Sequence, residues 1–296
     1  MKTYLAIDIG GTFVKTAIVD EKANILTSYK EKTPSSLEEL LGLMKRVKAS
    51  YHEISGVAVS CPGAVSDQGI IYGSSAVRYL HGPNIKKCIE ETLRLPVFLG
   101  NDANCAAYAE LWDGAAQGLR DFMVMVIGTG IGGAIIKDGV LHKGAHLHGG
   151  EFGYMLLDPD SIEDNSVWSR ITSTKALVKK VAKAKNQDYN TLSGEAVFQM
   201  AEAGDQICSE AVDRFYHLLA VGIYNLQYIY DPEVILIGGG ISARQELIDR
   251  LNEKLDRIIE RIGLAKMKPV IKSCQHRQHA NLLGAVYGFK KHCLDD

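Results

Sequence analysis

The chain has 296 residues, of which 46% are hydrophobic and 23% charged, and its formal net charge is −2. Two domains are expected, because single cores seldom exceed about 250 residues. The charge balance, without a basic or acidic block, speaks against nucleic acid and membrane partners and favours a small-molecule ligand. Six scattered cysteines without a CxxC pair predict free, buried thiols rather than disulfides or a cysteine-rich zinc site.

The chain carries neither a membrane-spanning pattern nor a signal-peptide pattern. No apolar run approaches the roughly 18 residues that span a bilayer. The first residues, MKTYLAIDIGG, pass directly into strand-like sequence without a cleavage pattern. We therefore expect a cytosolic protein.

The first part of the chain predicts a strand meander followed by alternating helices and strands. Such alternation is typical of parallel strands joined by helical crossovers. The expected strands lie at 4–9, 13–20, 25–29, 56–60 and 96–100, and the expected helices at 37–50, 85–94 and 102–113.

The pattern then starts again. DIGGTFVKTAIVD and VIGTGIGGAIIKD look like one design used twice, about 120 residues apart, and Asp138-Gly139 predicts a hairpin turn. Later strands are expected at 233–237 and 269–273, and later helices at 193–203, 207–229, 243–261 and 280–291. We predict a duplicated α/β plan with a cleft between its halves, in which residues 1–116 and 281–296 form one domain and 117–280 the other.

Three glycine turns follow apolar strands. Asp8 to Thr12 and Gly128 to Gly130 expose backbone N–H groups suited to phosphate oxygens, and Gly238 to Gly240 precedes a helix. Neither of the first two is a P-loop or a dinucleotide fingerprint, because both lead into a strand and those motifs open a helix. Each turn alone is a weak signal, since any hairpin can contain Gly-Gly.

Asn101 and Asp102 stand between a strand and a helix. Asp102 could simply cap that helix. Alternatively, its carboxylate lies at the carboxyl end of a parallel strand, where ligands of such sheets bind, and accepts a proton from a substrate hydroxyl.

Together the motifs resemble the ROK family of sugar kinases and repressors, which shares the ribonuclease H-like fold of actin and hexokinase. The resemblance covers nearly the whole chain, and within the family it is strongest to the β-glucoside kinases. The residues that carry it are DIGGT (8–12), CPG (61–63), GNDANC (100–105), IGTGIGGAI (127–135), GGEFGYML (149–156) and LIGGG (236–240).

The resemblance implies that ATP and Mg²⁺ are the cofactors. Asp8 would position the magnesium ion indirectly, and the adenosine would lie near Gly239 and Gly240. The other residues expected to bind the cofactor are Gly10, Gly11, Thr12, Lys15, Gly128, Thr129 and Gly130.

The resemblance also implies a sugar site in which Asp102 is the general base on the 6-hydroxyl. Phosphoryl transfer needs mainly alignment and charge stabilisation from the protein, so a weak carboxylate base that takes the proton late is sufficient. The residues expected to bind the sugar are Gly63, Asn84, Asn101, Asp102, Glu151 and Tyr154, with Glu151 presented by flexible glycines.

One departure from the family is informative. Many members carry ExGH followed by a CxCGxxGCxE segment, and these bind structural zinc, but here Tyr154 replaces the histidine and 158–170 has no cysteine. We therefore predict no structural zinc. His142, His146 and His148 are a poor substitute, because the last two would point oppositely along a strand.

Tyr154 also bears on the substrate. An aromatic ring there could stack on an aglycone or a second sugar, or it could be core packing. With the overall likeness, this favours a β-glucoside such as cellobiose over glucose.

The alternatives are a glucokinase, another hexose or N-acetylmannosamine kinase, a repressor, and an inactive sugar-binding protein. Only seven residues precede Asp8, which leaves no room for a repressor's DNA-binding helices. The resemblance further implies a homodimer. Whether Trp168 and its loop reach the pocket is left open.

Overall fold

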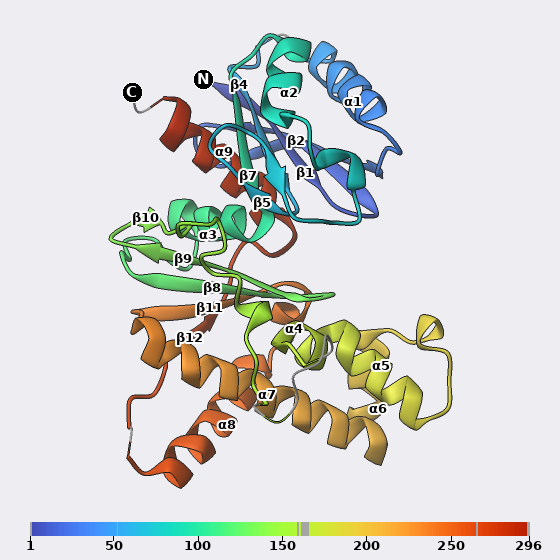
Figure 1. Cartoon of the computed structure of the whole chain (residues 1–296), viewed down its shortest axis with the longest axis vertical. Helices are drawn as coiled ribbons and strands as arrows, with labels where there is room; N and C mark the ends of the chain where they lie inside the picture. Colours follow the sequence, from blue (N-terminus) through green and yellow to red (C-terminus); the bar gives the residue numbers. More distant parts are fainter. Residues whose placement is uncertain (1, 52, 159, 161–165, 265, 295–296) are drawn as a thin grey trace. The chain divides into compact units, whose positions relative to one another are not determined.

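The computed structural model describes residues 2–51, 53–158, 160, 166–264 and 266–294. They form two compact units (Figure 1). Unit 1 comprises Met1–Gly118, Lys143–Gly149 and Gln278–Asp296, and unit 2 comprises Leu119–His142 and Gly150–Arg277. The expected division ran unbroken from 117 to 280, whereas here Lys143–Gly149 groups with unit 1.

Unit 1 is built on a five-stranded sheet whose order is β3-β2-β1-β4-β7. Strands β1, β2 and β3 form the expected antiparallel meander, and β1, β4 and β7 run parallel. The bounds are β1 Thr3–Ile9, β2 Phe13–Asp20, β3 Ile25–Lys32, β4 Gly56–Cys61 and β7 Val97–Asn101. A small separate hairpin, β5 (Ala64–Val65) with β6 (Ile71–Tyr72), had no counterpart among the expected strands.

Helices cover both faces of the sheet of unit 1, because its central strands are apolar on both sides. Alternate residues such as Leu5 and Val57 join a core cluster with helices α1 (Leu37–Ala49) and α2 (Ile85–Leu93). The residues between them face α3 (Asp102–Asp113) and α9 (Ala280–Cys293), so that the Tyr4 ring packs at a tilt against Phe289 with ring centroids 5.3 Å apart. The strand period of two thus assigns each side chain to one helix pair.

Helix α9 lies close to its neighbours because glycine stands at the contacts. A Cβ on Gly284 would come within 1.6 Å of the carbonyl oxygen of Cys105 in α3. A Cβ on Gly288 would come within 2.3 Å of the Phe98 ring. This helix, far from β1 in sequence, therefore completes the layer on one face of the first sheet.

Unit 2 repeats the strand plan of unit 1. Its sheet has the order β10-β9-β8-β11-β12, with an antiparallel meander followed by parallel strands. The bounds are β8 Phe122–Ile127, β9 Ile131–Lys137, β10 Val140–Leu141, β11 Val234–Gly238 and β12 Ile271–Ser273. The expected turn is present, since Asp138 and Gly139 both have positive φ, as a tight hairpin requires. The predicted duplication of an α/β fold is confirmed.

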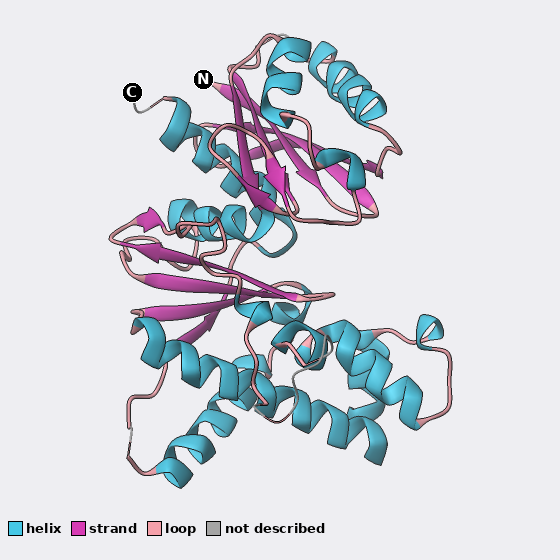
Figure 2. Ribbon diagram, viewed as in Figure 1, coloured by secondary structure: helices cyan, strands magenta, loops and turns pink. Residues whose placement is uncertain are grey.

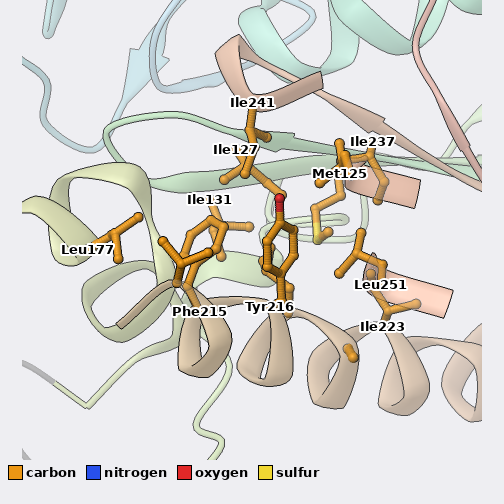
Figure 3. Packing of buried hydrophobic residues seen from close by; sticks show 14 of the residues in the cluster. Met125, Ile127, Ile131, Leu177, Phe215, Tyr216, Ile223, Ile237, Ile241 and Leu251 are labelled. Carbon is orange, nitrogen blue, oxygen red and sulfur yellow. The ribbon is translucent and has the colours of Figure 1, made fainter. Parts of the chain in front are cut away.

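The helices of unit 2 gather below its sheet in Figure 2. Their bounds are α4 Trp168–Thr172, α5 Thr174–Ala184, α6 Gly194–Glu202, α7 Gln206–Tyr230 and α8 Leu247–Ile262. Helix α7 carries Phe215, Tyr216 and Ile223 into a core shared with Met125 and Ile237 of the sheet (Figure 3). Short 3-10 turns stand at η1 Arg78–Leu80, η2 Phe152–Tyr154, η3 Tyr189–Thr191, η4 Gly240–Ala243 and η5 Arg277–His279.

Two parts of unit 2 differ from the sequence-based expectation. Helices α4 and α5 were not expected, although Ser173 caps α5 and its buried residues Leu177, Val178 and Val181 follow a helical period. The helix expected from 243 begins only at Leu247, because Arg244 has an extended backbone after η4.

All six cysteines are free. Cys61, Cys105, Cys208 and Cys274 are buried as expected, whereas Cys88 and Cys293 are only partly buried. In the part of the chain that the structure describes, no helix combines the length and the apolar character needed to span a bilayer.

Asp205 anchors the start of the longest helix, α7, and should make stability depend on pH. Its carboxylate accepts a hydrogen bond from Lys185 and another, 2.9 Å long, from the Cys208 backbone N–H. These bonds, that of Lys185 first, lower the pKa of Asp205 to about 2. A lowered pKa means stability that is present above the ordinary aspartate range and is lost as pH falls toward the folded value.

We expect Asp205→Asn to melt several degrees below the parent protein at pH 7, with the difference shrinking as pH falls from about 5 toward 2. Thermal melts at several pH values measure it. Lys185→Met should remove much of the same pH dependence, and the double variant should add little to either. A difference in melting temperature that stays constant down to pH 3 would contradict the assignment.

Candidate active site

The first glycine turn is the tip of the β1–β2 hairpin. Its closing pair is Ile9 and Val14, and the Gly10 N–H donates to the carbonyl of Phe13 at 3.0 Å. Thr33 fixes the turn from the side, because its hydroxyl donates to the Gly10 carbonyl at 2.6 Å. The turn is therefore a rigid cradle of exposed backbone rather than a flexible loop.

Asp8 is nearly buried beside this turn and is held by three partners. Its Oδ1 accepts from the Ser60 hydroxyl at 3.2 Å and from the Asn281 side chain at 3.0 Å. Its Oδ2 lies 3.5 Å from Lys15 Nζ, which also donates to the carbonyl of Gln278 at 3.1 Å. Asp8 and Lys15, both expected at the cofactor site, are thus brought together as an ion pair.

This donor set fits a magnesium ion bound mainly by phosphate and water. Asp8 offers a single carboxylate, whose Oδ1 accepts two hydrogen bonds and whose Oδ2 pairs with Lys15. Among the described residues no group of three His, Cys, Asp or Glu side chains could hold a metal. Mg²⁺ keeps several waters and commonly takes only one or two carboxylates besides substrate phosphates. Asp8 would then hold the ion through a water.

Asp102 stands at the carboxyl edge of the same sheet with its side chain exposed. It is the first residue of α3 and not its cap, because the Asn101 side chain accepts from the backbone N–H groups of Ala103 and Asn104. Asp102 Oδ1 accepts a hydrogen bond from Ala103 N–H at 2.8 Å, at the first turn of the helix. The simple capping interpretation of Asp102 is therefore wrong, and the carboxylate remains accessible to a ligand.

Asn101 links Asp102 to the CPG segment. While its oxygen caps α3, its Nδ2 donates to the carbonyl of Gly63 at 3.0 Å. Gly63 has φ +103°, and a Cβ there would come within 2.8 Å of Ile71. The structure thus brings Gly63, Asn101 and Asp102 together, and Asn101 keeps a second amide hydrogen for a ligand.

Asn84 has a structural use that the sequence did not reveal. It caps α2 by accepting from Lys87 N–H at 2.9 Å, and its Nδ2 donates to the carbonyl of Gln68 at 2.8 Å. Both ends of the side-chain amide therefore tie α2 to the turn between β5 and β6.

Two buried thiols, those of Cys61 and Cys105, lie near the carboxylates of Asp8 and Asp102. Burial raises the pKa of both Cys61 and Cys105, and the nearby charges of Asp8 and Asp102 raise it further. Both thiols therefore stay protonated and act as small apolar side chains.

In unit 2 the second glycine turn lies against the third. Gly128 to Gly130 closes the β8–β9 hairpin, and the Gly128 carbonyl accepts from Thr174 N–H at 3.0 Å. Gly239 has φ +87°, and a Cβ there would come within 2.2 Å of the carbonyl oxygen of Ile127. Only glycine fits at 239, so the two turns can touch.

These turns form one side of a cavity of about 1000 Å³ within unit 2. Ile127 and Ile241 line this cavity and also belong to the hydrophobic cluster shown in Figure 3. Gly128, Thr129 and Gly240 were expected here from the sequence. The lining residues that sequence reasoning missed come mainly from α5, α6 and the segment before α8: Thr174, Lys175, Val178, Tyr189, Leu192, Gly194, Glu195, Phe198, Ala243, Arg244, Gln245 and Glu246.

Glu151 is half-buried at the start of η2, and the backbone around it is tightly packed rather than flexible. A Cβ on Gly150 would come within 2.8 Å of Ala134, and one on Gly153 within 2.1 Å of the Ile131 carbonyl. The expectation that flexible glycines present Glu151 is therefore wrong. Gly150 and Gly153 instead allow η2 to pack closely against β9.

Tyr154 is 70% exposed, which excludes core packing for its ring. His146 lies in a turn and His148 in the loop after it, so neither is in a strand, and His148 Nδ1 is 2.6 Å from the carbonyl oxygen of His146. Of the segment 158–170, residues 159 and 161–165 lie outside the described residues. Trp168 is fully buried against Gly222 of α7 and belongs to the core.

Known proteins with the same organisation match nearly the whole chain. The model of the ROK family matches residues 4–292. A β-glucoside kinase of Listeria innocua is 36% identical over 96% of each chain. The crystal structure of a ROK family protein from Streptococcus pneumoniae in complex with sucrose is 38% identical and covers 98% of both chains with a TM-score of 0.91.

A ROK family glucokinase from Streptomyces griseus, solved with glucose and AMPPNP, is 25% identical and covers 96% of this chain and 97% of its own, with a TM-score of 0.80. These similarities cover nearly the whole chain rather than a single motif. The chain therefore belongs to the ROK family and is a sugar kinase of that family.

Proposed function

We propose that this kinase transfers the γ-phosphate of ATP to the 6-hydroxyl of a β-glucoside such as cellobiose. The proposed substrate rests mainly on the 36% identity to a β-glucoside kinase over 96% of both chains. The exposed ring of Tyr154 supports it, because an aromatic face can stack on an aglycone or second sugar. The sucrose complex of the pneumococcal relative is a further precedent for a disaccharide.

In this proposal Asp102 accepts the proton of the 6-hydroxyl as the oxygen bonds to phosphorus. Asn101 and Glu151 bind other hydroxyls, and Gly63 lines the same pocket. Asn84 is assigned a supporting role through α2. Backbone N–H groups of the first two glycine turns would bind the phosphates, where a bound magnesium ion supplies charge neutralisation. We further propose that the protein acts as a cytoplasmic homodimer.

The cavity of unit 2 is assigned to the adenosine. It has the size of small-molecule sites, and it opens beside the Gly128 and Gly240 turns. No zinc is assigned to the kinase, and elemental analysis of the purified protein that finds stoichiometric zinc would overturn this part.

The substrate proposal is tested by ADP release with cellobiose, another β-glucoside, sucrose, glucose and N-acetylmannosamine. We expect the highest kcat/KM for a β-glucoside, because transition-state discrimination appears directly in that ratio. If glucose or N-acetylmannosamine gives the highest value, the kinase is instead a glucokinase or an N-acetylmannosamine kinase.

Tyr154→Ala should lower kcat/KM for cellobiose roughly tenfold and leave that for glucose nearly unchanged, because stacking beyond the first sugar is lost. Tyr154→Phe is the matched control and should retain the value for cellobiose, since the ring remains. Equal losses for both sugars in the alanine variant would place Tyr154 outside the selection of substrate.

A further inference from the structure

Arg244 is a firmly held polar side chain of the cavity in unit 2. Its guanidinium carbon lies 4.1 Å from the centroid of the Phe198 ring. Its Nε donates to Glu246 and its Nη2 to Glu202. With these contacts only 20% of the side chain is exposed.

The break between η4 and α8 is what places Arg244 at the cavity. Its backbone is extended, with φ −77° and ψ 126°, and its N–H donates to the carbonyl of Ile241 at 3.0 Å. Both Ile241 and Phe198 line the cavity, as does Arg244 itself. The departure from a continuous helix therefore gives the cavity an arginine.

The contacts of Arg244 occupy part of the edge and one face of its guanidinium. Hydrogen bonds of a guanidinium lie in its plane, and here Glu202 and Glu246 take two of its donors and balance its charge. Phe198 covers one face. Because two carboxylates balance its charge, this guanidinium attracts a phosphate less strongly, and the face opposite Phe198 can stack on a flat ring.

The other residues that line the cavity agree with an arginine that binds a flat ring while backbone N–H groups bind the phosphates. Phosphates need backbone N–H donors, which the Gly128 to Gly130 turn offers on the same cavity. The lining also includes apolar and aromatic side chains, as expected around a base. Because two carboxylates and a ring already fix Arg244, little side-chain entropy is lost when a ligand binds.

We propose that Arg244 is the platform on which the nucleotide base stacks, with the base on the guanidinium face opposite Phe198. This rests on the proposed ATP-dependent kinase function and adds the residue that grips the base. Stacking reads the flat face shared by all purines, so the platform contributes affinity more than discrimination between adenine and guanine.

The test is calorimetric binding of ADP and of inorganic tripolyphosphate, which has no base, to the whole protein. Arg244→Met should weaken ADP binding roughly tenfold and leave tripolyphosphate binding unchanged. Arg244→Lys should give the same pattern, because it keeps the charge but loses the plane. Glu202→Gln, which removes the charge of one of the two carboxylates that hold Arg244, should weaken ADP binding less than the Arg244 variants do.

The matched control is Arg250→Met. Arg250 also lies over an aromatic ring, at 5.8 Å from the centroid of Tyr216, and within 3.8 Å of Asp213 and 3.6 Å of Glu253. It is not among the residues that line this cavity, so its loss should leave ADP binding unchanged.

Two results would overturn the platform. One is parent-like ADP binding by Arg244→Lys and Arg244→Met, and the other is an equal loss for ADP and tripolyphosphate, which would assign Arg244 to the phosphates. Failure of the parent protein itself to bind ADP would instead refute the proposed nucleotide-dependent function. Thermal melts of each variant identify a loss of binding that comes from unfolding. If the Arg244 variants unfold, Glu202→Gln is used instead: weaker binding of ADP but not of tripolyphosphate supports the platform, and parent-like ADP binding overturns it.

Discussion

Replacement of Asp102 by asparagine should lower kcat by about 10²–10⁴-fold, the usual contribution of a positioned general base. The change is nearly isosteric, and Asn101 rather than Asp102 caps α3, so the helix start should survive. Proton acceptance is lost because a carboxamide oxygen is a far weaker base than a carboxylate. Turnover with saturating ATP and sugar measures the effect.

Ligand binding separates a catalytic role of Asp102 from a structural one. Nucleotide affinity should be unchanged in Asp102→Asn, and sugar affinity should fall little, since an amide can still hydrogen-bond to a hydroxyl. The melting temperature should stay near that of the parent protein. A variant that binds both ligands and turns over at near-normal rate would remove Asp102 from the chemistry.

Gly284→Ala should be among the most destabilising single methyl additions in unit 1. The new Cβ would lie 1.6 Å from the carbonyl oxygen of Cys105, so α9 and α3 must move apart. Overpacking typically costs about 1–3 kcal/mol, and a backbone atom that opposes the new Cβ puts this case at the upper end. A fall in melting temperature of roughly 10 °C is expected.

Gly42→Ala in α1 is the matched control. It also replaces a helical glycine, but the nearest atom to its new Cβ is the end of the Arg46 side chain at 3.9 Å. Because alanine favours the helix, this variant should gain up to about 1 kcal/mol. Similar melting temperatures for the two variants would show that α9 can shift without cost.

Local pattern was enough to predict most of both sheets. Strands such as Tyr4–Ile9 are apolar runs ended by glycine, and the repetition of that signal in the second half predicted the duplicated topology. Asn101 and Asp102 were found because they stand where an apolar strand ends and a helix begins. These features depend on residues that are neighbours in sequence.

What could not be predicted depends on residues far apart in sequence. The capping of α3 by Asn101 also fixes Gly63. The rigidity of η2 comes from Gly153 pressed against β9, a contact that no local period encodes. Arg244 was missed for the same reason, because its role depends on Phe198 and Glu202 of another helix. Helix α5, in contrast, had a readable signal in its cap and apolar spacing.

The interleaving of the two units along the chain also orders their formation during synthesis. Unit 2 draws on Leu119–His142 and Gly150–Arg277, so the ribosome has delivered its whole sequence before α9 emerges. The first sheet must wait for α9 to cover Tyr4 and Phe98. Although domains often fold from the N-terminus onward, here the earlier sheet is expected to mature last, and a nascent chain without α9 would expose that apolar face to chaperones.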